Sequence, residues 1–481
     1  MTTSVIADLY STRHARLAHC PALPDVGGVL DRAGVREGQP FVLGANGSYD
    51  VHLNRFLREL PSWGVRADNS VMAYARDVTL FVRFLETSRR GKRIWDCDGE
   101  DLRAYKRVRL WTDGPQAVSV GTWNRSVAAL DKWVAWSLDA GLLPRAPFRY
   151  VDKTVMTPAG PRRVHVNAEM ESDPQDEPLR FVAFEDYLLW RNVGLRGELP
   201  EGRSDSRWRG RHGERNGLFA DVLVHSGMRL GEGASLLVPE VPPLSGPGEI
   251  RVAGAVAKRG RGRRVYLPPR KVRQVHHFLA VERDAIVVQC AAAGGFPGWS
   301  DARQVARAGR YALLAQGAQR SWPYARISPT ERRRLAWDDS GVVSGEPLWL
   351  WLADDGRPLQ SAAWQAAFRR ANERCTSFGL GIEVHPHTLR HTYAVYMLGL
   401  LLRQAVRALG QPLKGPLARS ELRRLLVGNP MRTLQLLLGH AREATVYVYL
   451  DVLDEAQEIV LGALAQWDAQ SVVLERMGTA G

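Results

Sequence analysis

Apolar residues recur at three- and four-residue steps through much of the chain, and this spacing is the strongest constraint on its fold. The segment NSVMAYARDVTLFVRFLE, which starts at Asn69, predicts an amphipathic helix with Ser70 as a candidate N-cap. Its apolar stripe consists of Val71, Tyr74, Val78, Phe81 and Leu85. GEDLRAYKRVRL predicts a second helix, and VGTWNRSVAALDKWVAWSLDAGLL a third that Gly141 would end. The stripe of the third consists of Trp123, Val127, Leu130, Val134 and Leu138. We therefore expect a compact helical domain over residues 66–150.

The rest of the chain divides into three further segments. Residues 1–65 form an N-terminal extension, and the sequence indicates no role for it. Residues 151–178 combine several prolines with an acidic end, and this composition predicts a linker. Residues 179–481 predict a second, mostly helical domain. Its exceptions are short β-favouring runs between glycines, which predict a small antiparallel sheet: Ile250–Val252, Ala255–Lys258 and Arg264–Leu267. The segment 284–345, with an Arg-rich helix candidate at ERRRLAW, has the character of an insertion. The predicted fold class is mainly α.

Charge indicates the class of partner. The net charge of +14 suits a polyanion, and the stretch from Ile250 to Val281 holds nine Lys or Arg with no Asp or Glu, which is typical of a solvated or phosphate-facing surface. No apolar stretch reaches the roughly 20 residues that a membrane helix needs, and the first residues lack the order of a secretory signal, so we expect a cytoplasmic protein. The four scattered cysteines predict reduced, structural thiols.

Four motifs in the second half carry titratable residues suited to phosphate chemistry. The first, HSGMRLGEGASLL, would place Arg229 and Glu232 on one helical face among apolar residues, so we expect a partly buried arginine that needs an anion. An exposed Arg–Glu pair is the ordinary alternative. The second, VAKRGRGRRVYLP, places Lys258 on the predicted hairpin, followed by Arg261, Arg263 and Arg264 as candidate DNA-binding residues. A generic basic turn is the alternative there.

The third and fourth motifs supply histidines and tyrosines. HPHTLRHTYAVYML places His387, Arg390 and His391 on one helical face, where His391 is as readily a structural residue. Two histidines four apart could suggest a metal, but no acidic third ligand follows, so we expect no metal site. In LLLGHAREATVYVYLDV, Tyr449 lies nine residues after His440. On a helix Tyr447 and Tyr449 would point about 200° apart, so at most one can face a shared pocket. Either could be a core aromatic.

This ordered series resembles the lambda-integrase or tyrosine recombinase family. The resemblance covers residues from about 66 to 470, and AYARDVTLFVRFL and TWNRSVAALDKWVAW resemble the family's helical core-binding domain. It implies a SAM-like core-binding domain and a mixed, mostly helical catalytic domain. It also implies roles for individual residues. Tyr449 matches the nucleophile, Arg229 and Arg390 the pair that clamps the scissile phosphate, and Lys258 the hairpin general acid. His387 matches the histidine that assists proton transfer, His440 the residue that hydrogen-bonds the phosphate, and Glu232 an acid that supports the site.

The implied function is site-specific DNA recombination or integration through a 3′-phosphotyrosine, for a mobile element, with no cofactor. The implied partners are double-stranded DNA, a homotetramer on that DNA, and accessory DNA-bending or directionality proteins as further candidates. Alternatives are a Xer-type resolvase, a type IB topoisomerase-like enzyme, and a non-catalytic DNA-binding protein. The segment LDEAQEIVLGALAQW places Leu453, Leu464 and Trp467 at roughly helical spacing, for a helix that packs on its own domain or on a neighbouring protomer.

Overall fold

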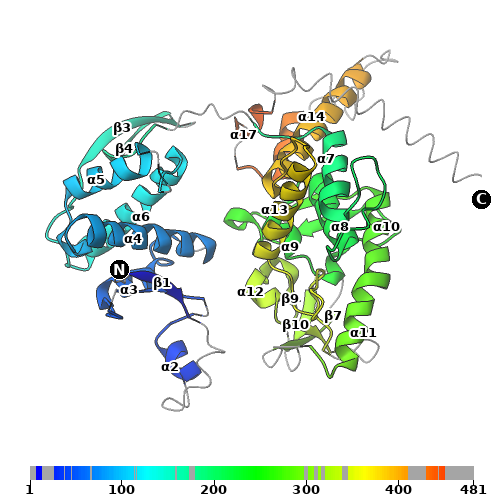
Figure 1. Ribbon diagram of the computed structural model, residues 1–481, viewed down its shortest axis with the longest axis horizontal. Helices are drawn as coiled ribbons and strands as arrows, with labels where there is room; N and C mark the ends of the chain where they lie inside the picture. The colour runs from blue at the N-terminus through cyan, green and yellow to red at the C-terminus, as the bar shows by residue number, and fades with distance from the viewer. Residues whose placement is uncertain are drawn as a thin grey trace, which may run out of the picture. The chain divides into compact units, whose positions relative to one another are not determined.

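The chain divides into two compact units, Met1–Glu177 and Pro178–Gly481. In this computed structural model, the structure describes the following residues: 7–12, 26–36, 38–44, 46–65, 68–112, 114, 116–157, 160–172, 179–296, 302–307, 312–315, 320–338, 345–409, 430–441 and 444–449. Each unit has its own hydrophobic core, and each is described by itself (Figure 1). The predicted C-terminal helix around Leu464 lies outside the described residues.

The first unit is built around three long helices that the apolar spacing predicts. They are α4 (Asp68–Ser88), α5 (Gly99–Leu110) and α6 (Val120–Asp139). Asp98 caps α5 by accepting hydrogen bonds from the amides of Glu100 and Asp101, and Ser119 caps α6 through the amide of Thr122. The three helices are confirmed. Two details were wrong: α4 already begins at Asp68, so Ser70 is not its cap, and Leu138 of the third stripe is exposed.

The segments on either side of these helices are more ordered than the sequence suggested. Before α4 lie two paired strands and two helices: β1 (Asp8–Ser11), α2 (Val26–Arg32), β2 (Pro40–Leu43) and α3 (Val51–Glu59). Phe56 and Leu57 of α3 are fully buried in the core of this unit, so residues 1–65 are not wholly an appendage. After α6, β3 (Tyr150–Thr157) and β4 (Gly160–Asn167) form an antiparallel hairpin. The predicted linker at 151–178 was therefore wrong for its first part, because alternating β-branched residues outweighed the prolines.

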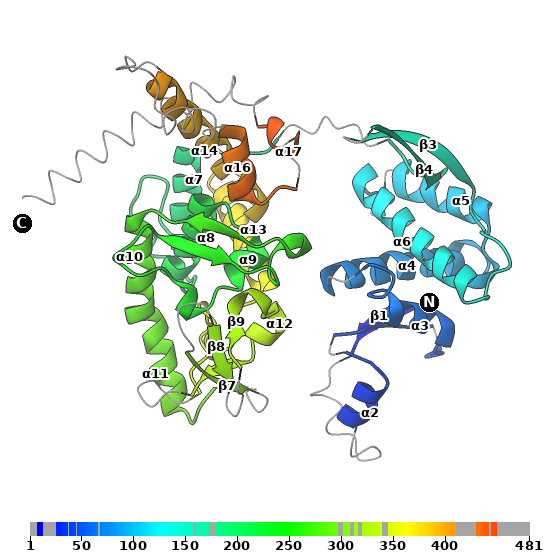
Figure 2. The ribbon, with the colours of Figure 1, turned by 180° about the vertical axis from the view of Figure 1, so that it is seen from behind.

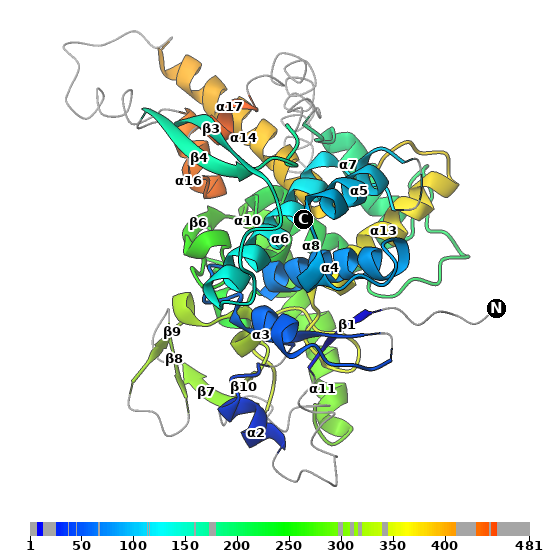
Figure 3. The same ribbon diagram turned by 90° about the vertical axis from the view of Figure 1, so that its left-hand side faces the viewer.

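The second unit is mostly helical, as predicted. Its helical elements up to residue 292 are α7 (Phe184–Trp190), η2 (Arg191–Arg196), α8 (Gly213–Ser226), α9 (Leu230–Ala234), η3 (Val238–Glu240), η4 (Lys258–Gly260), α10 (Pro269–Phe278), η5 (Leu279–Arg283) and α11 (Asp284–Ala292). The later ones are η6 (Tyr324–Arg326), α12 (Pro329–Arg332), α13 (Ser361–Ser377), α14 (Pro386–Leu409), α16 (Pro430–Leu438) and α17 (Ala444–Tyr447). Helix α14 contacts α8 and α16, which brings three of the sequence motifs to one region (Figure 2 and Figure 3).

Two sheets belong to this unit. Strands β5 (Glu249–Val252) and β6 (Arg263–Tyr266) pair antiparallel, which confirms two of the three predicted runs. The third, Ala255–Lys258, was wrong: it belongs to the turns between the strands, where Gly254 and Gly260 interrupt the extended chain. Within the predicted insertion lies a sheet of order β10-β7-β8-β9. Its strands are β7 (Arg303–Arg307), β8 (Ala312–Ala315), β9 (Trp322–Pro323) and β10 (Leu335–Trp337).

The Arg-rich stretch ERRRLAW is a single helical turn followed by β10, so the predicted helix there was mostly wrong. Arg332 is buried and donates two hydrogen bonds to Glu240, at 2.6 and 2.9 Å. The arginine therefore joins this segment to the core. Across the described ranges no helix is long and apolar enough to cross a membrane. Cys97, Cys290 and Cys375 are buried free thiols.

Candidate active site

The HSGMRLGEG segment turns sharply between two helices. Gly227 ends α8 with a φ of +64°, and a side chain there would clash with Tyr393, because an added Cβ would meet its ring at 2.3 Å. Arg229 then precedes α9 as its N-cap residue, so it does not share a helical face with Glu232 as predicted. Glu232 instead accepts hydrogen bonds from the Arg229 amide at 2.8 Å and from its Nη1 at 3.1 Å. The side chain of Arg229 is 27% exposed, so the expectation of a partly buried arginine is met.

Glu232 is the buried carboxylate of this region, and a second arginine also binds it. Arg263 donates from Nη1 at 2.9 Å and from Nη2 at 2.7 Å, in the two-pronged geometry that suits a carboxylate. Burial alone would raise the pKa of Glu232, but the hydrogen bonds and charge of Arg263, with Arg229, hold it below its ordinary value. Glu232 is therefore an anion that orients two arginines.

The start of α14 presents the third motif on one face, as predicted. Arg390 is 1% exposed and donates to two backbone carbonyls, those of Gly227 and Leu438. Desolvation, followed by the charges of Arg229 and Arg263, lowers its pKa to about 9. His387 and His391 lie on consecutive turns, with ring centroids 4.3 Å apart. Arg390 thus connects the turn before Arg229 with the turn before His440.

His440 follows α16 in a tight turn made by Leu438 and Gly439. Gly439 has a φ of +66°, and an added Cβ would meet Cδ of Arg263 at 2.8 Å, so a side chain would crowd this position. The His440 amide donates to the carbonyl of Gln435 at 3.0 Å. Its Nδ1 is buried and has no hydrogen-bond partner among the described residues. An unsatisfied buried nitrogen at this position is suited to an added ligand.

The two tyrosines after α16 have opposite environments. Tyr449 is 2% exposed, and its hydroxyl lies 3.1 Å from Nδ1 of His391. Its ring is stacked near His440, with centroids 6.4 Å apart. Tyr447 is 50% exposed. Desolvation raises the pKa of Tyr449, and the charges of Arg390 and Arg229 partly oppose that rise.

Three histidines of the region favour the neutral form. Desolvation, then the neighbouring His387 and Arg390, lowers the pKa of His391 to about 4. Desolvation, then Arg390, Arg229 and Arg263, lowers that of His440 to about 4. The pKa of His387 is lowered by desolvation and by the charges of Arg390, Arg229 and Lys258. The site is therefore rich in positive charge that discourages further protonation.

The basic run divides between two environments. Lys258 is exposed at the start of η4, close enough to contribute to the field at His387. Arg261 and Arg264 are also exposed, and Arg264 lies 3.4 Å from Glu249. The side chain of Arg263, by contrast, is 5% exposed and paired with Glu232, and that of Lys271 is 11% exposed and paired with Asp221. The expectation that the whole stretch lies on a solvated surface was therefore wrong, because two of its cations neutralise buried carboxylates.

The structure brings together Arg229, Glu232, Arg390, His387, His440 and Tyr449, with Lys258 at the edge. His391, predicted to be as readily structural, contacts the hydroxyl of Tyr449, and Arg263, predicted as a DNA-binding residue, binds Glu232. The spacing of His391 from His387 placed it on the right face, but its contact with Tyr449 joins residues 58 positions apart. Among the residues that the structure describes, no group of His, Cys, Asp or Glu is arranged to hold a metal ion.

Comparisons with known proteins give one family match, in the first unit, and several similar solved structures. The family model of the phage integrase N-terminal SAM-like domain matches residues 53–141. A search of curated proteins finds no match. Among solved structures, XerA recombinase is 16% identical, with 83% of this chain and 92% of that chain covered and a TM-score of 0.29. XerH recombinase bound to its difH substrate before cleavage is 15% identical, with 84% of this chain and 83% of that chain covered and a TM-score of 0.42.

A third solved structure is a lambda integrase dimer bound to a core site, which is 12% identical, with 83% of this chain and 93% of that chain covered and a TM-score of 0.41. The predicted resemblance to the family's helical domain is thus confirmed over residues 53–141, a match that also includes most of α3. Residues 53–141 of this chain are therefore similar to the phage integrase N-terminal SAM-like domain.

Proposed function

We propose that the chain is a tyrosine-type site-specific DNA recombinase or integrase that cuts and rejoins DNA through a covalent bond to Tyr449. One observation carries the proposal: a buried tyrosine hydroxyl lies within a cluster of arginines and neutral histidines that has an excess of positive charge. The carboxylate of Glu232 cannot balance Arg229, Arg263 and Arg390 together. A phosphodiester would supply the missing negative charge.

Arg229 and Arg390 are the proposed phosphate-binding residues. Guanidinium groups stay charged and donate to two oxygens at once, which suits the nonbridging oxygens of a phosphodiester. Attack by the tyrosine adds negative charge to those oxygens, so donors held in place beforehand stabilise the transition state more than the ground state. Glu232 holds Arg229, and two carbonyls hold Arg390, so both arginines are oriented before DNA arrives. The Nδ1 of His440, which has no hydrogen-bond partner among the described residues, supports a further contact to the phosphate.

Tyr449 must lose a proton to become a nucleophile. A phenol with a pKa near 10 is ionised in about one molecule in a thousand at pH 7, and burial makes ionisation harder still. His391 is placed to accept this proton, because it is neutral and its Nδ1 lies 3.1 Å from the hydroxyl. The new bond joins the Tyr449 oxygen to phosphorus, while the bond from phosphorus to the 5′ oxygen breaks.

The departing 5′ oxygen needs a proton in return. Lys258 is the proposed donor, since it is cationic, exposed toward solvent and near His387. The phosphotyrosine retains the energy of the phosphodiester, so a 5′ hydroxyl can attack it and reseal the strand without ATP. These side chains supply the proton transfers and the charge stabilisation that the reaction requires, so we propose that no metal or cofactor takes part.

The proposed partner is double-stranded DNA, with exposed Arg261 and Arg264 as backbone contacts. Assembly as a homotetramer, a mobile element as the genetic context and accessory DNA-bending proteins belong to the same proposal. The SAM-like domain favours a recombinase or integrase over a type IB topoisomerase. The complete set of reactive side chains around Tyr449 favours an enzyme over a non-catalytic DNA-binding protein.

The test uses the full chain and a duplex selected from a random-sequence library for binding to the Tyr449→Phe variant. A nick close to the cleavage position lets the short strand diffuse away and traps the intermediate. We expect an SDS-resistant protein–DNA adduct with the wild type and with Tyr447→Phe, and none with Tyr449→Phe. An adduct with Tyr449→Phe, or its absence with the wild type on a tightly bound duplex, would contradict the proposal.

A further inference from the structure

We propose that Arg263 is a positioning residue that fixes Arg229 and His440 relative to each other, and that it does not serve as a DNA contact. The inference rests on the proposed function, because it concerns the geometry of that same site. Arg263 lies in the most basic stretch of the chain, where net charge alone would assign it to DNA. Its contacts indicate a different role.

One side of the Arg263 guanidinium binds Glu232. Both terminal nitrogens donate to the two carboxylate oxygens, at 2.9 and 2.7 Å. The same two oxygens hold the Nη1 and the amide of Arg229, at 3.1 and 2.8 Å. Arg263 therefore fixes the rotation of the carboxylate, and the carboxylate fixes Arg229.

The other contacts of Arg263 reach the turn that carries His440. Its Nε donates to the carbonyl of Leu437 at 2.7 Å, at the end of α16. Its aliphatic part lies against Gly439, where an added Cβ would meet Cδ at 2.8 Å. Arg390 binds the next carbonyl, that of Leu438, so two arginines hold neighbouring carbonyls of one turn. This turn sets the direction of the His440 ring.

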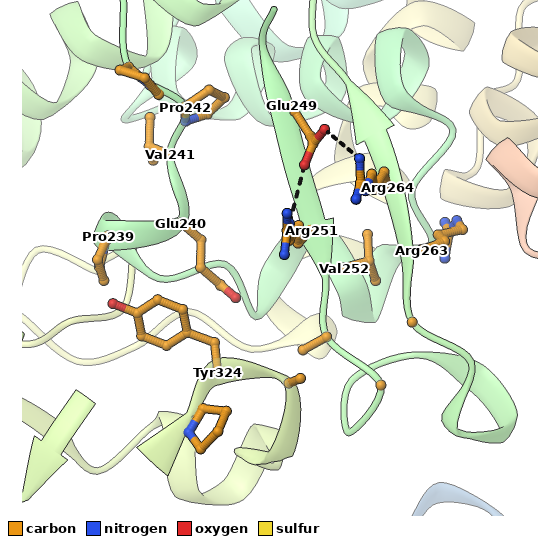
Figure 4. A pocket seen from close by; sticks show the side chains of 16 residues that line it. Pro239, Glu240, Val241, Pro242, Glu249, Arg251, Val252, Arg263, Arg264 and Tyr324 are labelled. Carbon is orange, nitrogen blue, oxygen red and sulfur yellow. Dashed lines mark hydrogen bonds and ion pairs between the residues drawn. The ribbon is translucent and has the colours of Figure 1, made fainter. Parts of the chain in front are cut away.

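The pleat of β6 separates Arg263 from Arg264. Neighbouring residues in a strand point to opposite faces, and Figure 4 shows Arg264 directed toward Glu249 while Arg263 lies on the other side of the strand. A hollow of about 370 Å³ beside the hairpin is lined by both arginines, by prolines and by Tyr324, so the hollow does not separate them; their contacts and exposure do. Arg264 is exposed, whereas the side chain of Arg263 is 5% exposed. The two adjacent arginines therefore lie in different environments.

The geometry requires an arginine at position 263. A guanidinium presents donors in a rigid fork, so one group can bind both carboxylate oxygens and still donate from Nε to a carbonyl. A lysine would keep a positive charge near Glu232, but its single ammonium cannot maintain all three hydrogen bonds. Arg263→Lys thus separates charge neutralisation from positioning.

The first arm of the test needs no DNA. Hydrogen exchange followed by mass spectrometry is measured on the full chain for Arg263→Gln and Arg263→Lys, in peptides that cover residues 227–234 and 435–441. The amides of Arg229 and His440 donate within this network, so we expect their exchange to accelerate in both variants. Arg332→Gln is the matched control, because Arg332 also makes a buried two-pronged pair with a glutamate, and its hydrogen bond to the carbonyl of Ser235 lies just outside the first peptide. It should leave both peptides unchanged.

The second arm measures adduct formation on the selected, nicked duplex. A displacement of about 1 Å in a reactive geometry costs on the order of 100-fold in rate, so we expect about that loss for Arg263→Gln at saturating DNA. The DNA concentration at half-saturation should change by less than about threefold, since the lost interactions are internal. The saturated rate of Arg263→Lys should lie between those of the wild type and Arg263→Gln. Arg332→Gln should react at the wild-type rate, at a temperature where each variant is folded.

The outcomes separate the two proposals. Unchanged exchange in Arg263→Gln, or wild-type exchange and rate in Arg263→Lys, would overturn the positioning role. A large rise in half-saturating DNA at an unchanged saturated rate would overturn it as well, because that result marks a DNA contact. If the wild type forms no adduct, the proposed function fails, and the exchange data alone then decide whether Arg263 holds the two segments together.

Discussion

Two buried charge clusters in the Pro178–Gly481 unit differ in how completely the protein satisfies them. The first surrounds Asp221 of α8, which is fully buried. Asp221 accepts hydrogen bonds from Tyr187 at 2.6 Å, from Arg191 at 2.8 Å and from Lys271 at 2.8 Å. Burial would raise the pKa of Asp221, but Arg191 and Lys271 hold it well below its ordinary value. We refer to these four residues as the Asp221 cluster.

The second cluster is the candidate site, and its charges are not balanced internally. Glu232 is bound by Arg229 and Arg263, while Arg390 binds only backbone carbonyls among the contacts that the structure describes. The pKa values of His391 and His440 are lowered to about 4, and Nδ1 of His440 is unpartnered among the described residues. In the Asp221 cluster each cation is bonded to the carboxylate, whereas in the second cluster Arg390 has no carboxylate partner among the described residues. An arginine without a paired carboxylate, rather than basicity alone, distinguishes the candidate binding site from the structural ion network.

The largest expected effect is on catalysis, and it should be confined to the second cluster. Arg390→Gln removes a charge that would face the phosphate, so the saturated rate of adduct formation should fall by roughly 100- to 1,000-fold. Lys271→Gln removes a cation from the Asp221 cluster and should leave that rate unchanged in folded protein. The measurement is single-turnover adduct formation on the nicked duplex. Equal losses for the two variants would remove the distinction between the clusters.

The second effect is on stability, and it should favour the Asp221 cluster. Asp221→Asn leaves Arg191 and Lys271 without their buried carboxylate, so the free energy of unfolding should fall by about 3–5 kcal/mol. Glu214→Gln, which breaks a pair between the exposed Glu214 and the half-buried Arg196, should change the free energy of unfolding much less. Urea unfolding measures both variants. A small loss for Asp221→Asn would show that the cluster contributes little to the fold.

The third effect is the dependence of stability on pH. The pKa values of His391 and His440 are lowered to about 4 from an ordinary 6.5, so the unfolded state binds more protons between these values. The unfolding free energy should therefore decrease as pH falls from about 6.5 to 4. A variant with both histidines replaced by glutamine should show a shallower decrease over that window. An unchanged slope would show that these histidines have the same pKa in the folded protein as in the unfolded chain.

The smallest effect tests the exposed arginines of the hairpin. Arg261→Gln and Arg264→Gln should each weaken DNA binding and reduce the slope of log affinity against log salt by about 0.9 per lost phosphate contact. Arg263→Gln should leave the slope unchanged, because its charge is already paired with Glu232. Binding titrations at several salt concentrations give the slopes. A reduced slope for Arg263→Gln would place that side chain on the phosphate backbone.

Local patterns predicted the helices well, and long-range pairing explains most of what they missed. The stripes around Phe81 and Trp123 defined α4 and α6, since helical periodicity depends on near neighbours. The hairpin at 150–167 was missed because prolines and charges hid its alternation. In the site, the family resemblance drew attention to Tyr449 and Arg390. It could not show that Arg263 pairs with Glu232, because that contact depends on how the β5–β6 hairpin lies against α9 and α16.

Because side chains alternate along β6, the position of each arginine in the strand decides whether it points inward or to solvent. Removing or adding one residue between the turn and the strand would exchange the faces of the two adjacent arginines, while composition and net charge stayed almost the same. The inward position would then receive a side chain at the wrong place, and a cation that belongs inside would point to solvent. In this hairpin the order of the arginines therefore holds information that their number does not.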